Sequence, residues 1–289
     1  MYVFNGNVCI RKNHFLGGPV IDKGGERVGP GDNYFSHSTN NVWVDTNGYL
    51  HLKIDQRNGT YYAAEIISQQ SFGHGRYRFF VDGRIDNYDE NIVAGLFTYD
   101  TEFLDPDSST NEIDIEFTKA FTSNTNLAGK NAVFGSKPEV PSNYFHLHNS
   151  GYTLPANALT LHSFTWFTDK IDFKSQKTHD LWPAQSNLIA EFNYPGPHIP
   201  PISQGTEQVR LNLWIFQALN TTLVNTQNLE LVFRDFHFTP LDDYDGDGLF
   251  DEDETWIYIT DPNDSDTDGD GCNDGDEVNS ETQPLGGKC

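Results

Sequence analysis

Apolar and polar residues alternate along much of the chain, which is the pattern of β-strands that bury one face. In residues 49–54 every second position is leucine or isoleucine, and this segment follows a second strand candidate at 41–45. The Asn47-Gly48 dipeptide between them predicts a tight hairpin turn of the primed type. Further strands are predicted over residues 77–81, 92–99, 112–117, 161–167, 209–216 and 229–238.

Many short strands joined by glycine- and asparagine-rich turns favour an all-β sandwich or barrel. No convincing amphipathic helix occurs before residue 240. The apolar phase shifts between Phe233 and Phe236, which predicts a β-bulge in the last strand. Residues 183–201 are rich in aromatic residues and proline, and we expect a long ordered loop there.

Charge divides the chain into two parts. The 289 residues include 42 acidic and 18 basic ones, and residues 241–289 hold 17 of the acidic and one of the basic residues. We therefore expect a large domain over 1–240 and a small appendage over 241–289. The net charge of −24 excludes a nucleic-acid-binding protein, because phosphates need basic partners. No apolar run is long enough to predict a membrane span.

The sharpest feature is a strand on which three acids alternate with apolar residues. Glu112, Asp114 and Glu116 share one face, because successive side chains of a strand point to opposite sides. Neighbouring carboxylates repel one another, so at least one of them has a raised pKa and stays protonated near neutral pH. A protonated carboxylic acid beside an ionised carboxylate is what glycoside hydrolysis requires.

The spacing of these acids sets a geometric condition. A retaining glycosidase needs two carboxyl groups about 5–5.5 Å apart. The Cα atoms of Glu112 and Glu116 would lie about 13 Å apart on a regular strand. We therefore expect both glutamates to lean toward each other over the shorter Asp114, on a curved strand. A second interpretation is a solvated acidic face on an edge strand, where acids discourage aggregation.

The sequence around this strand resembles the family 16 glycoside hydrolases, whose hallmark is Glu-x-Asp-x-Glu on a jelly-roll strand. Within that family it is most similar to the licheninases, which cleave mixed-linked β-1,3-1,4-glucan. The ordered landmarks are NVWVDTNGYL at 41–50, AE at 64–65, FGHGRY at 72–77, LFTY at 96–99, LHSFTW at 161–166 and LNLW at 211–214. The resemblance implies a two-sheet antiparallel β-jelly-roll sandwich. It also implies Glu112 as the nucleophile, Asp114 as the residue that assists it, and Glu116 as the general acid/base.

The resemblance further implies a sugar-binding cleft lined by Glu65, Phe97, Tyr99, Asn212 and Trp214. Alternation in residues 209–216 agrees, because it places Asn212 and Trp214 on the face opposite the core residues. A flat aromatic ring can stack on a pyranose while a neighbouring amide binds its hydroxyl groups. A second interpretation is that Trp214 simply belongs to the core.

Several features depart from the family pattern, among them residues 118–120 after the acid-bearing strand and a longer, proline-rich segment at 174–208. Arg76 and Arg78 occupy positions where the corresponding turn commonly carries a glutamate, and Ile67 replaces a cleft arginine of the licheninases. These changes leave the three acids intact. They leave open whether the substrate is mixed-linked β-glucan, a galactan or another β-linked polysaccharide.

The acidic appendage contains the twelve-residue calcium loop twice, at 243–254 and 266–277. The predicted Ca²⁺ ligands are Asp243, Asp245, Asp247, Leu249, Asp251, Glu254, Asp266, Asp268, Asp270, Cys272, Asp274 and Glu277. Without strong flanking helices, the segment resembles thrombospondin type 3 repeats, in which the chain wraps calcium ions and has little core of its own. A merely solvated acidic tail is the alternative.

Cysteines and the start of the chain bear on where the protein acts. Cys9, Cys272 and Cys289 make neither a disulfide framework nor a zinc set, although a Cys272–Cys289 bridge would close the appendage. No secretion leader is visible, so either it was removed or the chain is cytosolic. The calcium loops favour a secreted or cell-surface protein, because extracellular calcium suits loops of modest affinity.

Together these features predict a secreted, retaining glycoside hydrolase that cleaves internal β-linkages of a polysaccharide. Calcium would be structural in the appendage, and catalysis would need no cofactor. The appendage is a candidate for attachment to a cell surface or cell wall. The alternative is a non-catalytic carbohydrate-binding or adhesive module on a calcium-stabilised stalk, which has no evident need for three adjacent acids.

Overall fold

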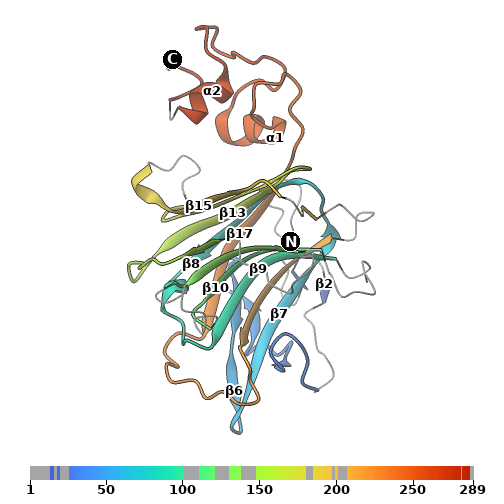
Figure 1. The fold of residues 1–289 in the computed structure, drawn as a ribbon, viewed down its shortest axis with the longest axis vertical. Helices are drawn as coiled ribbons and strands as arrows, with labels where there is room; N and C mark the ends of the chain where they lie inside the picture. The colour runs from blue at the N-terminus through green and yellow to red at the C-terminus, as the bar shows by residue number, and fades with distance from the viewer. Residues whose placement is uncertain are drawn as a thin grey trace.

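The computed structural model describes residues 14–15, 18–19, 26–100, 111–120, 130–137, 148–179, 185–196, 199–200, 207–280 and 282–286. Two large sheets pack face to face as a sandwich, and a small C-terminal appendage lies at one end of it (Figure 1). The predicted all-β sandwich is confirmed. No helix within the described ranges is long and apolar enough to cross a membrane.

The first sheet, called here the cleft sheet, has eight strands and is antiparallel except where β3 meets β7. Its order is β12 (His148–Ser150), β11 (Ala132–Lys137), β10 (Glu112–Thr118), β9 (Ile92–Asp100), β16 (Glu207–Ile215), β7 (Thr60–Ser71) and β3 (Tyr34–Phe35), with β6 (Asp55–Arg57) paired to β7. The acid-bearing β10 lies inside this sheet, between β9 and β11. The interpretation of its acids as a solvated edge-strand face is therefore wrong.

The second sheet, called here the outer sheet, has seven antiparallel strands. Its order is β15 (Leu188–Tyr194), β14 (Ile171–Gln176), β13 (Leu159–Trp166), β8 (Gly75–Asp82), β17 (Glu230–Pro240), β5 (Leu50–Lys53) and β4 (Val42–Val44). A separate ribbon of β1 (His14–Phe15) and β2 (Gly18–Pro19) precedes both sheets, and short 3-10 turns η1 (Ile85–Asn87) and η3 (Gln185–Asn187) lie in connections.

The main core lies between the two sheets and takes one face of their central strands. On β10, Ile113, Ile115 and Phe117 are fully buried, and they pack in the same cluster as Tyr77 and Phe79 of β8. A shift of one residue in strand register would turn every side chain to the other face. Burial of these apolar residues therefore fixes the acids of β10 on the opposite face of the cleft sheet.

The predicted bulge and the predicted hairpin are confirmed, but the predicted primed turn of that hairpin is wrong. The register of β17 against β8 shifts between Phe233 and Asp235, which is the predicted bulge. β4 and β5 form the predicted hairpin, but of Asn47 and Gly48 only Gly48 has a positive φ, of 89°. A type I′ turn needs a positive φ at both central residues. The observed turn is longer, and within it the Asp45 carboxylate accepts hydrogen bonds from the backbone N–H groups of Asn47 and Tyr49.

The prediction of a loop throughout residues 183–201 is wrong, because β15 lies within it. This strand pairs with β14 and forms one edge of the outer sheet. Four of the five prolines in this segment stand at or after Pro195, which directly follows the strand. Proline donates no backbone hydrogen bond, so it ends the pairing without preventing the strand before it.

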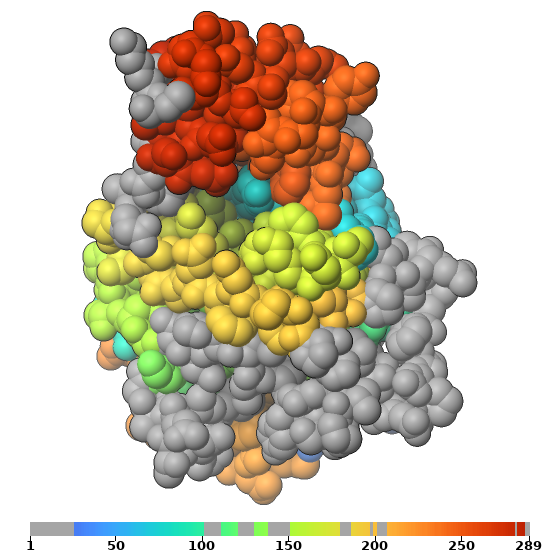
Figure 2. Space-filling view, turned by 45° about the horizontal axis from the view of Figure 1, so that its top comes forward, coloured from blue at the N-terminus to red at the C-terminus, as the bar shows by residue number. Residues whose placement is uncertain are grey.

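The appendage contains short helical turns and no strand among its described residues, 241–280 and 282–286. α1 (Asp251–Asp253) continues into a π-helical turn, η4 (Glu254–Tyr258), and α2 (Asp274–Asn279) follows the second acidic loop. Figure 2 shows the appendage as a distinct lobe at the end of the sandwich. Each acidic loop thus leads into a helical turn of a few residues, shorter than an ordinary helix.

A buried polar contact, called here the clasp, joins the appendage to the outer sheet. The Asp253 carboxylate is 1% exposed and accepts hydrogen bonds from Arg76 (2.6 Å), Arg78 (2.7 Å) and Thr239 (3.0 Å). Burial acts to raise the pKa of Asp253, but the two arginines outweigh it and lower the pKa. Arg76 also lies 4.7 Å from the ring centroid of Phe250. The two arginines that depart from the family pattern therefore bind the appendage.

Candidate functional site

A cleft of about 490 Å³ lies on the face of the cleft sheet that carries the acids of β10. Its lining comes from five neighbouring strands, β7, β9, β10, β11 and β16, and from the segment before β3. The lining residues are Gly29, Pro30, Glu65, Phe97, Tyr99, Glu112, Asp114, Glu116, Lys137, Arg210, Asn212 and Trp214. All eight residues predicted to be catalytic or substrate-binding are brought together here.

Strand pairing explains why residues far apart in sequence share this cleft. Asp114 lies opposite Phe97 across β9 and β10, and Asn212 lies opposite Glu65 across β7 and β16. Residues directly opposite each other on antiparallel strands point to the same face. The alternation that buries the core therefore gathers the acids, aromatic rings and amide on one surface.

Gly95 leaves room at the centre of this surface. It lies between Glu116 on one neighbouring strand and Asn212 on the other. A Cβ atom at this position would stand 2.6 Å from the Oδ1 atom of Asn212, which is too close for any real contact. The missing side chain therefore allows the Asn212 amide to lie beside the acids.

Burial and mutual repulsion control protonation of the three acids. Asp114 is 2% exposed and Glu116 is 8% exposed. Burial, and then the charge of Glu112, raises the pKa of Glu116 to about 8. Burial, followed by the charges of Glu112 and Glu116, raises the pKa of Asp114 well above its ordinary value. Glu116 is therefore mainly a protonated acid at neutral pH.

Lys137 is a cleft residue that the sequence analysis missed. It lies opposite Glu112 across β10 and β11, and its Nζ atom is 2.6 Å from Oε2 of Glu112. Burial acts to lower the pKa of Lys137, but the charges of Glu112 and Asp114 raise it overall. Glu112 thus forms an ion pair with a residue from the adjacent strand. Without a predicted strand over 132–137, no sequence signal could place this lysine.

Arg210 is the second cation that the sequence analysis missed. Its guanidinium lies 4.4 Å from the ring centroid of Tyr99, and its Nη1 is 3.4 Å from Oε1 of Glu65. It is also directly opposite Ile67 across β7 and β16. A guanidinium therefore lies in the cleft on the strand next to Ile67. The alternation of β16 could have identified it, because Arg210 shares the face of Asn212.

Several buried polar atoms of the cleft have no hydrogen-bond partner within the described chain. They are Oδ2 of Asp114, Oε2 of Glu116, Nε of Arg210, Oδ1 of Asn212 and Nε1 of Trp214. Buried polar atoms in folded proteins are nearly always paired, so a concentration of unpaired ones needs an explanation. Both donors and acceptors are present, which suits a ligand rich in hydroxyl groups.

Trp214 forms part of the cleft floor and is not an open platform. Its side chain is 6% exposed and packs with Phe35, Ala63 and Val93 in a small cluster apart from the main core. Gly31 lies against the ring, where a Cβ atom would stand 2.7 Å from Cζ3. Both interpretations of this residue hold in part, because it is packed like a core residue and also lines the cleft.

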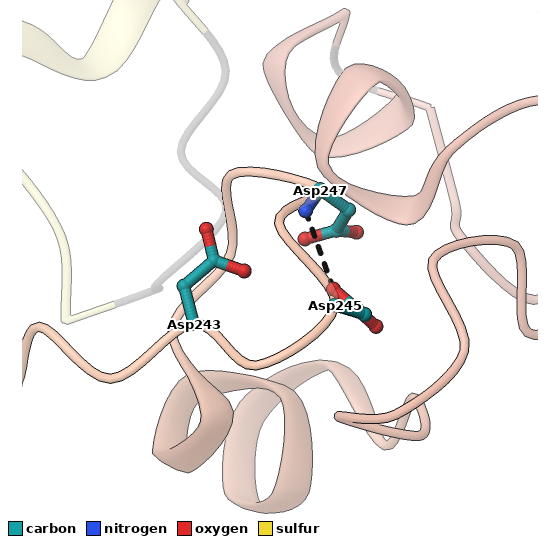
Figure 3. Close-up of side chains that lie close together, drawn as sticks. All are labelled: Asp243, Asp245 and Asp247. Atoms are coloured by element: carbon teal, nitrogen blue, oxygen red, sulfur yellow. Dashed lines mark hydrogen bonds between the residues drawn. The ribbon is translucent and has the colours of Figure 1, made fainter.

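The first acidic loop of the appendage gathers three carboxylates. Asp243, Asp245 and Asp247 place ligand oxygens within 4.8 Å of one another (Figure 3). Backbone N–H groups of the same loop fix their directions, as when Gly246 donates to Asp243 at 2.8 Å. Gly248, at the loop position where a calcium loop turns sharply, has a φ of 98°. The loop therefore combines grouped carboxylate oxygens with a left-handed glycine at its sixth position.

The second loop repeats this geometry. Asp266, Asp268 and Asp270 form an equivalent group, and Gly271 has a φ of 99°. The backbone N–H groups of Gly269 and Gly271 donate to Asp266, as those of Gly246 and Gly248 do to Asp243. A repeated hydrogen-bond pattern in two loops indicates that their shape follows from the sequence.

A third group joins the two loops. Asp247 and Glu254 of the first loop lie with Asp274 of the second, again with ligand oxygens within 4.8 Å. Glu254 is fully buried with no partner for Oε2, and Glu277 is 1% exposed with no partner for either carboxylate oxygen. A buried carboxylate without a donor or cation is unfavourable. These residues therefore fit the oxygen ligands of a cation.

Cys272 lies within the second loop and is disulfide-bonded. The other two cysteines, Cys9 and Cys289, lie outside the described residues. The predicted Cys272–Cys289 pairing accordingly stays a prediction.

Comparison with known proteins supports the fold. No family model matches the sequence, and no curated protein matches it. Among solved structures, the Bacillus licheniformis β-glucanase has a TM-score of 0.51 and 19% sequence identity, over 82% of this chain and 91% of that chain. A prokaryotic β-1,3-1,4-glucanase (lichenase) derived from a mouse hindgut metagenome has a TM-score of 0.51 and 18% identity, over 82% and 95%.

A third similar structure carries a different description. It is an immunostimulatory antigen and pseudo β-1,3-glucanase of Mycobacterium tuberculosis, with a TM-score of 0.52 and 13% identity, over 80% of this chain and 97% of that chain. Identities this low show the fold alone, which is the jelly-roll sandwich of glucanases. Function has to be argued from the residues of the cleft.

Proposed function

We propose that this protein is a retaining glycoside hydrolase that cleaves internal β-linkages of a polysaccharide. The observation that carries the proposal is the acid trio of β10 in one cleft. Glu116 is buried and protonated at neutral pH, while Glu112 is paired with a lysine. One acid and one carboxylate on the same strand are the two groups that retaining hydrolysis needs.

The proposed reaction has two steps. In the first, Glu112 attacks the anomeric carbon as the glycosidic bond breaks, and Glu116 gives its proton to the leaving oxygen. In the second, Glu116 takes a proton from water, the water oxygen attacks the same carbon, and the ester bond to Glu112 breaks. Asp114 lies between them and shares a hydrogen bond with Glu112, which helps to orient it.

The rest of the cleft supports a sugar chain as the ligand. Tyr99 and Phe97 offer aromatic surface, and Arg210, Asn212 and Glu65 offer polar groups of both kinds. This mixture suits a pyranose, which has apolar faces and a rim of hydroxyl groups. We propose β-1,3-1,4-glucan, or a related β-glucan or galactan, as the substrate, because two of the similar structures are described as β-glucanases.

For the appendage we propose structural calcium. The two loops with matching geometry and the unpaired buried oxygens of Glu254 and Glu277 support this proposal. Ligands would come from the carboxylates of both loops and from the backbone carbonyls of Leu249 and Cys272, as in the twelve-residue calcium loop. An exported protein, attached to a cell surface or cell wall through the appendage, agrees with loops of this kind.

A panel of β-linked polysaccharides, assayed for new reducing ends, tests the proposed function. Glu112→Gln and Glu116→Gln should each lower turnover by orders of magnitude, because each removes a covalent or proton-transfer step. Glu191→Gln is the matched control, since Glu191 is exposed on β15, an edge strand of the outer sheet, and does not line the cleft. Unchanged activity in both cleft variants would contradict the proposal. Glycan binding without new reducing ends would favour the non-catalytic carbohydrate-binding module instead.

A further inference from the structure

Lys137 places a cation against the residue proposed as nucleophile. Its Nζ atom is 2.6 Å from Oε2 of Glu112, and the two side chains are 34% and 13% exposed. The pair is held across β10 and β11, whose register puts the two residues directly opposite each other. A charge-assisted hydrogen bond in such a partly buried place is stronger than one on an open surface.

Among the described charged groups of the cleft, Lys137 is the cation that pairs with Glu112. Arg210 lies over Tyr99 and is 3.4 Å from Glu65. Asp114 and Glu116 share the face of Glu112, and their charges act on Lys137 in the same direction as that of Glu112. The groups that face Lys137 and Glu112 from β7, β9, β10 and β16 are Glu65, Tyr99, Asp114, Glu116 and Arg210.

The charge of Glu112 changes twice in the proposed reaction. It disappears when the carboxylate oxygen bonds to the anomeric carbon, and it returns when water breaks that bond and the electron pair goes back to the same carboxylate. A cation beside Glu112 stabilises the charged states and not the neutral ester. It therefore favours departure of Glu112 in the second step, at some cost to its attack in the first.

We propose that Lys137 is a positioning residue that orients Glu112 for attack and stabilises it as the leaving carboxylate in hydrolysis of the glycosyl–enzyme. This inference rests on the proposed function. It gives Lys137 a kinetic role, which a lysine that only tied two strands together would lack.

Lys137→Met, Lys137→Gln and Lys137→Arg test this inference, with Lys174→Met on the exposed face of β14 as the matched control. An aryl β-glycoside with a good leaving group serves as the substrate, because the first step is then fast. In Lys137→Met and Lys137→Gln we expect the second step to slow about 10- to 100-fold, the size of one charge-assisted hydrogen bond. Lys137→Arg should recover most of the rate.

The decisive readout is the rate at which the covalent intermediate decays. Because the first step is fast, the glycosyl adduct builds up in both proteins, and mass spectrometry of the intact protein after removal of the substrate should show it disappearing about 10- to 100-fold more slowly in Lys137→Gln than in the wild type. Equal decay rates in wild type and variant would overturn the inference. Thermal unfolding of each variant separates this effect from a loss of folding.

A failure of the proposed function gives a different result. The wild-type protein would then form no adduct at Glu112 with a 2-deoxy-2-fluoro glycosyl fluoride and would release no sugar. In that case carboxyl NMR titration of Glu116 still tests the electrostatic role of Lys137. Lys137→Gln should raise the pKa of Glu116, because the lysine charge lowers it in the wild type. An unchanged pKa of Glu116 would overturn the role of Lys137 independently of activity.

Discussion

Protonation of single side chains sets what the cleft can do at a given pH. Glu116 is buried beside Glu112, and both causes favour its neutral form. Asp114 is buried between them and is also shifted toward the neutral form. Within the described part of the chain, Glu112 is the one of the three acids with a cation at hydrogen-bond distance. The burial and the neighbouring charges of each carboxyl group thus give different roles to three acidic residues of similar chemistry.

The pH dependence of activity follows from Glu116. As the general acid it must carry its proton, so turnover should fall as pH rises through about 8, where the folded protein releases that proton. Measurement of kcat/KM over a wide pH range checks this expectation. A basic limb near pH 4.5, the ordinary value of a glutamate, would contradict the assignment of Glu116 as a buried acid.

At the scale of secondary-structure elements, alternation predicted those strands that have one apolar and one polar face. β5, β10 and β16 have this pattern, and on β10 and β16 the residues that face the cleft could be named in advance. β7 and β11 were not predicted as strands from alternation. Their central residues are buried on both faces, under the core on one side and in or near the cleft on the other. A strand covered on both faces loses the period of two.

The lysine and arginine of the cleft show the consequence of that loss. Lys137 belongs to β11, so neither its face nor its partner could be derived without the strand. Arg210 was on a predicted strand, but its contact with Glu65 depends on the pairing of β16 with β7. Sequence alternation gives the face of a residue. The pairing order of the strands, which no local pattern contains, gives its neighbours.

The clasp is the element-scale contact with the clearest effect on stability. Asp253→Ala leaves the buried guanidinium of Arg78 without its carboxylate, and breaking one side of a buried ion pair costs about 3–5 kcal/mol. Asp55→Ala is the control, because Asp55 pairs with Arg57 on a more open surface, where a pair contributes about 1 kcal/mol or less. Chemical denaturation of both variants measures the difference. Equal losses would show that the clasp contributes no more than a surface pair.

At the scale of the whole molecule, the sandwich and the appendage follow different physical rules. The sandwich buries a large apolar core between its sheets. The appendage carries most of the net charge and buries few apolar side chains, such as Leu249 and Phe250. Repulsion among its carboxylates opposes a compact form unless cations are bound. That the two parts are separate domains, divided near Pro240, remains a prediction from the composition.

Calcium should stabilise the appendage and, through the clasp, its attachment to the sandwich. α1 and η4 carry Asp253 of the clasp and Glu254 of the first acidic loop as neighbouring residues. A ligand present at 100 times its dissociation constant stabilises the folded form by about 2.7 kcal/mol per site. Calorimetric melting with calcium and with a chelator measures this effect. Asp243→Asn should reduce it, and an identical melting curve under both conditions would contradict structural calcium.

The central claim is that Glu112 and Glu116 act together on one anomeric carbon by double displacement. Proton NMR of the first product formed from mixed-linked β-glucan tests it most directly, because the configuration of the new reducing end records the number of displacements. The account predicts that the β-anomer appears first and then equilibrates with the α-anomer. Initial formation of the α-anomer would show a single displacement and would contradict the account.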